Sequence, residues 1–324
     1  MNTSQRICND ILSGDRAALA KAITLMESSL DQHQLLANEV LDLCLPHSGN
    51  SIRIAITGVP GVGKSTFIDA FGHYLIDQCH KKVAVLAIDP SSQQTRGSIL
   101  GDKTRMNRLA SSEHAFVRPS PSGTALGGVA AQTRESILLC EAAGYDVVLV
   151  ETVGVGQSET LVHSMVDLFL LLLLPGAGDE LQGIKRGIVE MADAILINKS
   201  DTNPKLAKEA ENHYKNALQL LHSARRDWKV EVTQVDSISE KNLHKVWKTA
   251  LHFVDIQKAN ASFDRTRKEQ SAKWFEEQVG NLLLDRFQRD KGLAKLHEEL
   301  RNKVVEQKTS SRAAATLLVN KVFG

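Results

Sequence analysis

The sequence has few cysteines and no cysteine pattern. Its 324 residues contain no C-x-x-C pair, and the four cysteines are far apart: Cys8, Cys44, Cys79 and Cys140. This spacing excludes a disulfide framework and is typical of reduced, mostly buried thiols. The charge is also nearly balanced, at +1 at pH 7, so no bulk field attracts nucleic acid or a membrane surface. We therefore expect neither of these as a partner.

No apolar run is long enough to cross a bilayer. The most apolar run, Leu168 to Leu174, ends at Pro175 and suits a strand that is buried on both faces. The first residues lead into a helical pattern and do not read as a signal peptide. A cytoplasmic location follows, with a mature mitochondrial chain as the alternative.

A phosphate-binding loop is the most informative feature that is present. Residues 58–66 read G-V-P-G-V-G-K-S-T, after an apolar run at 52–57 and before a helical pattern. In that context the glycines let backbone N–H groups turn toward the phosphates, and the helix adds its positive dipole end. Lys64 would reach the β- and γ-phosphate oxygens, and the Ser65 hydroxyl would ligate Mg²⁺. We expect nucleotide contacts from Gly58, Gly61, Val62, Gly63, Lys64, Ser65 and Thr66.

Strand and helix patterns alternate around this loop. Strands are expected at 52–57, 83–88, 115–118, 147–151, 168–174, 194–198 and 230–235, with helices such as 64–78, 128–143, 183–191 and 204–222 between them. Such alternation predicts an α/β fold, a mostly parallel sheet with helices on both faces. We expect an N-terminal helical extension at 1–48, a P-loop domain at 49–256 and a C-terminal helical arm at 257–324. The arm either packs on its own domain or forms a dimer.

Two carboxylates stand at predicted strand ends. Asp89 follows the strand at 83–88, and Glu151 follows the apolar residues 147–150. Ligands of parallel sheets bind beyond the carboxyl ends of the strands, so both side chains can hold Mg²⁺ directly or through water. Gly154, three residues after Glu151, would let the backbone approach the γ-phosphate. The alternative is a surface carboxylate that only caps its strand.

The sequence N-K-S-D at 198–201 indicates the base. The Asp201 carboxylate can accept both hydrogens from the N1 and N2 edge of guanine, which adenine does not offer. Asn198 would tie the nearby loops together, and the stem of Lys199 would stack over the base. Downstream of a P-loop and an E-x-x-G sequence, this box predicts GTP rather than ATP. Ser237 is a weaker candidate for the loop that contacts guanine O6 through its backbone.

Intrinsic hydrolysis is expected to be slow. In Ras-like proteins a glutamine directly after the glycine orients the attacking water, whereas Val155 stands here and has no hydrogen-bonding group. Gln157 lies two positions further on. The glycine-rich residues 175–185 leave a buried strand and open a helix, and they either complete the site or form an ordinary turn.

These motifs resemble the MeaB/ArgK-type GTPases associated with methylmalonyl-CoA mutase, which are P-loop G-protein chaperones of the SIMIBI class. The resemblance covers essentially the whole chain. Besides the N-K-S-D box, its most specific stretches are 58–66, 87–92, 97–106, 139–144, 150–159 and 179–183.

The resemblance implies a homodimeric chaperone of an adenosylcobalamin-dependent acyl-CoA mutase. Such proteins gate cofactor loading and protect or reactivate the mutase, and the mutase accelerates GTP hydrolysis. The resemblance also implies an acidic Mg²⁺ environment of Asp89, Asp102 and Glu151. Gln182 and Lys185 would belong to an additional switch that responds to the partner and the nucleotide.

Two loops depart from the family pattern. Where the family has P-S-S-P-x-T-G-G, residues 90–97 read P-S-S-Q-Q-T-R-G, so Gln93 and Gln94 follow the serines and Arg96 adds a cation. Loss of a proline and a glycine changes the stiffness of this switch-like loop. The usual S-A-L base loop is Asp236-Ser237-Ile238 here.

Other functions remain as alternatives. A metal-delivery GTPase of similar architecture needs a metal-binding cluster, and the sequence has no C-x-x-C, no histidine-rich tract and no close Cys–His pair. A kinase linked to basic amino-acid transport would most simply use ATP, and the N-K-S-D box argues against it. A non-catalytic scaffold would not need the intact phosphate and Mg²⁺ residues.

Overall fold

The structure of the chain, a computed structural model, describes residues 2–88, 106–119, 126–152, 157–176, 186–220 and 227–323. The chain divides into two compact units, Met1–Arg267 and Lys268–Gly324. Among the described residues, no helix has the length and hydrophobicity that a membrane span requires.

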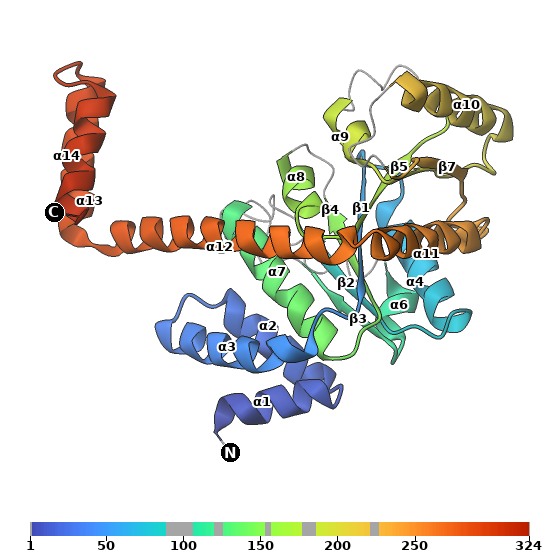
Figure 1. Cartoon of the computed structure of the whole chain (residues 1–324), viewed down its shortest axis with the longest axis horizontal. Coiled ribbons are helices and arrows are strands. Elements are labelled where there is room, and N and C mark those ends of the chain that lie inside the picture. Colours follow the sequence, from blue (N-terminus) through green and yellow to red (C-terminus); the bar gives the residue numbers. More distant parts are fainter. Residues whose placement is uncertain are drawn as a thin grey trace. The chain divides into compact units, whose positions relative to one another are not determined.

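The first unit contains a seven-stranded sheet in the order β3-β2-β4-β1-β5-β6-β7 (Figure 1). All neighbouring strands are parallel, which confirms the predicted mostly parallel sheet of an α/β fold. Each strand ends within one residue of its prediction: β1 (Ile52–Gly58), β2 (Val83–Ile88), β3 (Ala115–Arg118), β4 (Val147–Thr152), β5 (Leu168–Leu173), β6 (Ala194–Ile197) and β7 (Glu231–Gln234). The central position of β1 places the P-loop at the middle of the sheet's carboxyl edge.

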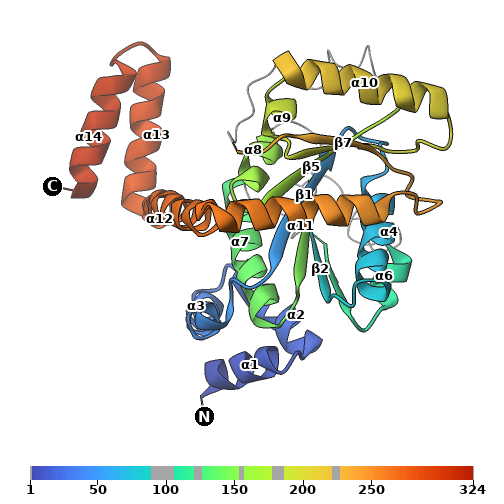
Figure 2. The ribbon, with the colours of Figure 1, turned by 45° about the vertical axis from the view of Figure 1, so that its right-hand side comes forward.

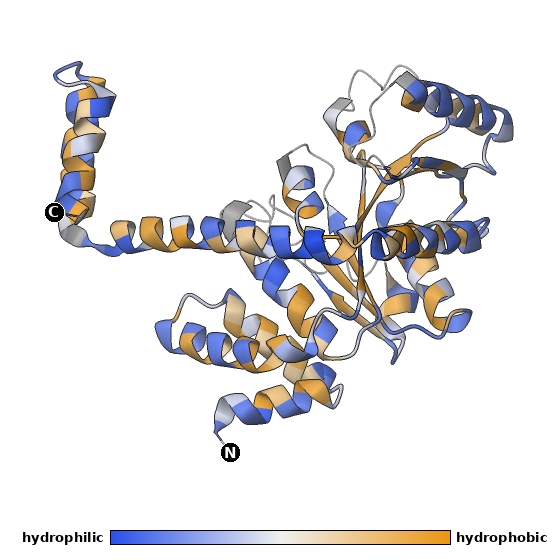
Figure 3. Ribbon diagram, viewed as in Figure 1, coloured by the Kyte–Doolittle hydropathy of each residue, from blue (hydrophilic) through white to orange (hydrophobic). Residues whose placement is uncertain are grey.

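Helices cover both faces of this sheet (Figure 2). One face carries α4 (Lys64–Asp77), α6 (Asn107–Ser111) and α11 (Leu243–Ala259), and the other carries α7 (Leu126–Ala142), α8 (Gln157–His163), α9 (Arg186–Met191) and α10 (Pro204–Leu220). Phe67 and Phe71 of α4 stack with ring centroids 5.4 Å apart and pack on Ile54 and Ile56 of β1. Strands β5 and β6 are apolar along their length, because both of their faces are buried (Figure 3).

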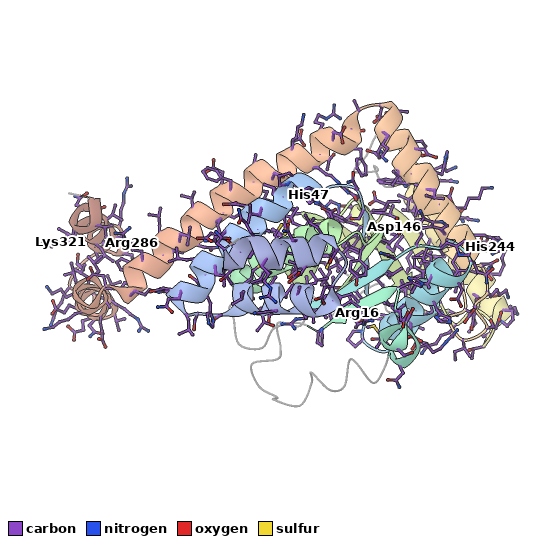
Figure 4. The ribbon with its side chains drawn as sticks, turned by 90° about the horizontal axis from the view of Figure 1, so that it is seen from below. Arg16, His47, Asp146, His244, Arg286 and Lys321 are labelled. Carbon is purple, nitrogen blue, oxygen red and sulfur yellow. The ribbon has the colours of Figure 1, made fainter. Side chains whose placement is uncertain are left out.

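The N-terminal helices pack on this unit. They are α1 (Thr3–Leu12), α2 (Arg16–Glu27) and α3 (Asp31–Cys44), followed by the short 3₁₀ helix η1 (Leu45–His47). Asp15 caps α2, since its Oδ1 accepts from the backbone N–H of Ala17 at 2.7 Å. Arg16, labelled in Figure 4, donates to the Ser112 carbonyl oxygen at 3.1 Å. Contacts between α2 and α7 complete the attachment of this extension.

A buried ion network lies at the amino edge of the sheet. Arg53 of β1 donates from Nε and Nη2 to the two carboxylate oxygens of Glu141, both at 2.8 Å. Arg267 donates in the same bidentate way to Asp167, at 2.8 and 2.6 Å. Burial raises the pKa of Glu141, but hydrogen bonds from Arg53 and Ser51 outweigh it and hold that pKa below its ordinary value. Loss of one partner would leave a buried charge unpaired, at a cost of about 3–5 kcal/mol.

The second unit is helical. It holds residues 268–289 of α12 (Ser262–Arg289), with α13 (Lys291–Val305) and α14 (Ser311–Phe323), and the last two helices pack on each other. Asp290 caps α13 by accepting from the backbone N–H groups of Gly292 and Leu293 at 2.8 and 3.0 Å. Large apolar side chains remain exposed along these helices: Phe275, Val279, Leu282, Leu283, Leu284, Val305, Leu317, Val319 and Val322.

Candidate functional site

The P-loop joins β1 to α4, and two of its glycines are required by close contacts. Gly58 has φ +150°, and a Cβ there would lie 2.4 Å from the carbonyl oxygen of Leu172 on β5. Gly63 has φ +95°, and its Cβ would lie 2.9 Å from Nδ2 of Asn198. Any larger residue would therefore push the loop away from its two neighbours. The loop delivers the chain into α4, which begins at Lys64 as the sequence predicts.

Lys64 folds back over the P-loop. Its Nζ donates to the carbonyl oxygens of Gly58 at 2.8 Å and Val59 at 3.4 Å. Burial lowers the pKa of Lys64 from its ordinary value, and the carboxylates of Glu151 and Glu159 oppose that shift. The ammonium group thus lies at the N-terminus of α4, where a helix already favours anions.

Ser65 meets the carboxylate at the end of β4. Its Oγ donates to Oε1 of Glu151 at 2.9 Å, and Glu151 is 9% exposed. Glu151 is the last residue of the predicted strand and the last but one of β4, which continues to Thr152. The next residue, Thr152, donates from its hydroxyl to that of Thr57 at 2.8 Å and ties β4 to β1. Two oxygen donors of the predicted metal set are therefore adjacent.

Asn198 joins three loops. Its Nδ2 donates to the carbonyl oxygen of Val62 in the P-loop at 2.9 Å, and its Oδ1 accepts from the Ser237 hydroxyl at 2.8 Å. The side chain of Lys199 extends over the P-loop as well, and its Nζ donates to the Gly61 carbonyl oxygen at 3.0 Å. Asn198 is fully buried, so these bonds fix the relative positions of the P-loop, the N-K-S-D box and the Ser237 loop.

Asp201 lies at the exposed rim of the same edge. Its Oδ1 pairs with the ammonium group of Lys241, and its Oδ2 accepts from the Ser239 hydroxyl at 2.7 Å. The hydrogen bonds from Lys241 and Ser239 hold the pKa of Asp201 below its ordinary value. The carboxylate is therefore ionised and accepts only, which is what the N1–H and N2–H₂ donors of guanine need.

Most of the predicted residues gather at this carboxyl edge. The P-loop residues from Gly58 to Thr66 come together with Glu151, Asn198, Lys199, Asp201 and Ser237. Asp89, Asp102, Gly154, Gln182 and Lys185 lie outside the described residues, as do Arg96 and Val155. Within the described ranges, no three His, Cys, Asp or Glu side chains form a group that could hold a metal ion.

Two residues of this edge escaped the sequence analysis: Ser239 and Lys241. They lie in a turn of which the sequence analysis considered only Asp236, Ser237 and Ile238, and Lys241 is separated from Asp201 by a whole helix and a strand. Charged residues in a polar turn give no sequence signal of their own. The clue that was available is the departure from S-A-L, since an aspartate in a turn often accepts backbone N–H bonds.

The fold, with a P-loop between β1 and α4, is that of a P-loop GTPase, a class of protein that hydrolyses GTP. A family model described as "Methylmalonyl Co-A mutase-associated GTPase MeaB" matches residues 19–292. The chain belongs to this MeaB family and is a GTPase that binds guanine nucleotide.

Individual relatives agree with this assignment. The chain is 44% identical to "GTPase ArgK" of Escherichia coli over 96% of its length and 95% of that protein. It is 40% identical to "Methylmalonic aciduria type A homolog, mitochondrial" of Mus musculus, over 97% of this chain and 78% of that one. A crystal structure described as "LAO/AO transport system kinase" superposes with a TM-score of 0.79 at 36% identity, covering 100% of this chain and 99% of that chain.

Proposed function

We propose that this GTPase is a chaperone of an adenosylcobalamin-dependent acyl-CoA mutase of the methylmalonyl-CoA type. It would gate loading of the cofactor and protect or reactivate the mutase. The observation that carries the proposal is the extent of the family match. The description of the matching family names the mutase, and the mouse relative is named for methylmalonic aciduria. The relatives from Escherichia coli and mouse align over 96% and 97% of this chain, so the similarity extends into the helical segments before β1 and after β7.

The nucleotide roles follow from the contacts at the carboxyl edge. Backbone N–H groups of residues 58–66, Pro60 excepted, would cradle the α- and β-phosphates, and Lys64 would turn from its carbonyl partners to the β- and γ-phosphate oxygens. Asp201 reads the guanine edge, and the Ser237 backbone lies toward O6. Asn198 holds these two recognition segments against the P-loop, so base and phosphates are bound by one rigid frame.

A magnesium ion suits the donors at this edge. Oγ of Ser65 and Oε1 of Glu151 are 2.9 Å apart. Two neighbouring ligands in an octahedron with bonds of about 2.0–2.1 Å are separated by about 2.9 Å. We propose that the carboxylates of Asp89 and Asp102 also bind the Mg²⁺ ion, directly or through water. Ser65 and Glu151 would hold the ion beside Lys64, and the bound ion would supply positive charge to balance the β- and γ-phosphates.

Hydrolysis is proposed to depend on the partner. Val155 offers no group to orient water, and this role passes to the segment that contains Gln182 and Lys185, whose response is driven by the mutase. Lys64 and Glu151 would be the catalytic residues that act together with this segment, Lys64 at the phosphates and Glu151 at the Mg²⁺ ion. Binding of the mutase would therefore trigger GTP hydrolysis, as a protein that controls cofactor loading requires.

The second unit is proposed to form the homodimer. Among the described side chains of α12–α14, nine large apolar ones are exposed, from 38% for Val279 to 74% for Val305. Exposed apolar surface on a helical arm is typical of an interface between copies.

A second candidate is a kinase linked to basic amino-acid transport, because the solved relative carries a transport-system kinase name. Asp201 argues against it. The carboxylate that accepts from guanine has no matching donors on adenine, the usual base of a kinase substrate.

Complex formation tests the proposal. The chain is mixed with methylmalonyl-CoA mutase of the same cell and sedimented with a non-hydrolysable GTP analogue, with GDP and with neither. We expect a complex with micromolar or tighter affinity, about −8 kcal/mol or better, whose strength changes between analogue and GDP. A chain that sediments alone under all three conditions would count against the mutase as partner. An unrelated acyl-CoA enzyme serves as the negative control.

A further inference from the structure

We propose that Lys241 is a positioning residue that gives Asp201 its selectivity for the 2-amino group of guanine. The inference rests on the proposed role of Asp201 in base recognition. It concerns a residue 40 positions further along the chain, on a different loop.

The two oxygens of Asp201 are held by different atoms of one turn. Lys241 pairs with Oδ1, and the Ser239 hydroxyl donates to Oδ2 at 2.7 Å. The same hydroxyl also lies 3.3 Å from Oδ1 of Asp236, its third neighbour back along the turn. Both ends of the carboxylate are therefore restrained, although the group lies at the exposed rim of the site.

The turn that supplies these contacts is itself rigid. Residues 236–241 are closed by two backbone hydrogen bonds between Asp236 and Lys241, at 3.0 and 3.3 Å. Oδ1 of Asp236 accepts from the backbone N–H groups of Ile238 and Ser239, both at 3.0 Å. The aspartate that departs from S-A-L thus organises the turn that carries Ser239 and Lys241.

An anchor outside the turn adds to this order. Glu240, inside the turn, accepts from Nη1 of Arg108 on α6 at 2.8 Å. Asn242, directly after the turn, donates from Nδ2 to the Gln234 carbonyl oxygen at 2.8 Å at the end of β7. Lys241 therefore extends toward Asp201 from a fixed backbone.

The physical consequence concerns rotation of the carboxylate. The terminal torsion of an aspartate is broad, so a free carboxylate presents its two oxygens in many planes. Guanine offers two parallel donors, N1–H and N2–H₂, and both can bond only when the carboxylate lies in the plane of the base. Each oxygen has two lone pairs, so Lys241 and Ser239 can occupy one on each oxygen and leave another for the base. Restraint of the Asp201 carboxylate plane thus favours guanine, which forms two hydrogen bonds with it.

Inosine nucleotides distinguish a positioning role of Lys241 from a merely structural role in the turn. Hypoxanthine retains N1–H and lacks the 2-amino group, so it needs only one oxygen of Asp201. A rotating carboxylate can satisfy one donor nearly as well as a fixed one. Removal of Lys241 should therefore weaken GTP more than ITP, while a merely structural role in the turn would weaken both alike.

The experiment measures dissociation constants of GTP and ITP, without the mutase, for Lys241→Met, Lys241→Arg and the parent chain. Methionine keeps the unbranched stem and removes the charge. We expect Lys241→Met to lower the ITP-to-GTP ratio of dissociation constants at least about fivefold, about 1 kcal/mol. Lys241→Arg should keep most of that ratio. Ser239→Ala should also lower this ratio, because the substitution removes the hydrogen bond to Oδ2 of Asp201.

Controls make each outcome decisive. Lys245→Met, an exposed lysine on the first turn of α11, should leave the ratio unchanged. An equal loss of GTP and ITP binding in Lys241→Met would overturn the positioning role, and tighter GTP binding would mean that Lys241 competes with the base. Asp201→Asn is measured in parallel. If that variant keeps the parent's preference for GTP, the assignment of Asp201 fails; if only the lysine variants lack an effect, the assignment stands and this inference alone fails.

Discussion

Replacement of Lys64 by alanine is expected to lower GTP turnover at least about a hundredfold, the usual effect of removing one preorganised hydrogen-bond donor that stabilises a transition state. The Lys64 ammonium lies 2.8 Å from the Gly58 carbonyl oxygen, at the start of α4 and beside the Ser65–Glu151 pair. Single-turnover hydrolysis of γ-labelled GTP measures the loss, and fluorescent GDP reports the accompanying weakening of phosphate binding.

The matched control is Lys205→Ala, at an exposed position near the start of α10. It removes the same charge from an exposed side chain outside the P-loop and the N-K-S-D box, and this variant should hydrolyse GTP like the parent. Because Lys64 is partly buried, thermal unfolding of the variant is compared with that of the parent. Parent-like turnover in a folded Lys64→Ala chain would remove the P-loop from the mechanism.

Replacement of Asp201 by asparagine is expected to weaken GTP binding about a hundredfold or more and to raise the relative affinity for XTP. A site built on buried or paired polar groups rejects a ligand that leaves them unmatched by several kcal/mol. Asparagine presents one acceptor and one NH₂ donor where the aspartate presents two acceptors. Xanthine carries a carbonyl at position 2, which that NH₂ can meet, whereas the guanine amino group faces it as a second donor.

Competition between GTP and XTP for the fluorescent nucleotide measures this exchange. Asp255→Asn, at an exposed site on α11, is the control and should keep the parent's preference. An Asp201→Asn chain that still prefers GTP by the parent's margin would show that another residue reads the base.

Much of the fold could be predicted from local patterns. The buried strands are continuous apolar runs of four to seven residues bounded by turns, so β1 and β5 are visible in the sequence almost to the residue. The P-loop, Glu151 and the N-K-S-D box could also be predicted from local patterns, because each belongs to a short motif at the end of a strand. In a parallel sheet the carboxyl ends of all strands lie at the same edge, so these motifs were expected to come together.

Contacts between distant segments could not be predicted. Arg53, Glu141, Asp167 and Arg267 are ordinary charged residues in the sequence, and only the packing of β1, α7 and α12 makes them a buried network. The pairing of Asp201 with Lys241 has the same origin. A salt bridge between loops depends on the register of β6 and β7, which a single sequence does not reveal.

GTP hydrolysis in the presence of the mutase tests the proposed function most directly. Turnover by the parent chain is measured alone and with a saturating amount of methylmalonyl-CoA mutase from the same cell, with Lys64→Ala as the inactive control. The account predicts an acceleration of at least about tenfold, roughly 1.4 kcal/mol of activation free energy. Hydrolysis at an unchanged rate with every adenosylcobalamin-dependent mutase of that cell would contradict the proposal that the mutase times this GTPase.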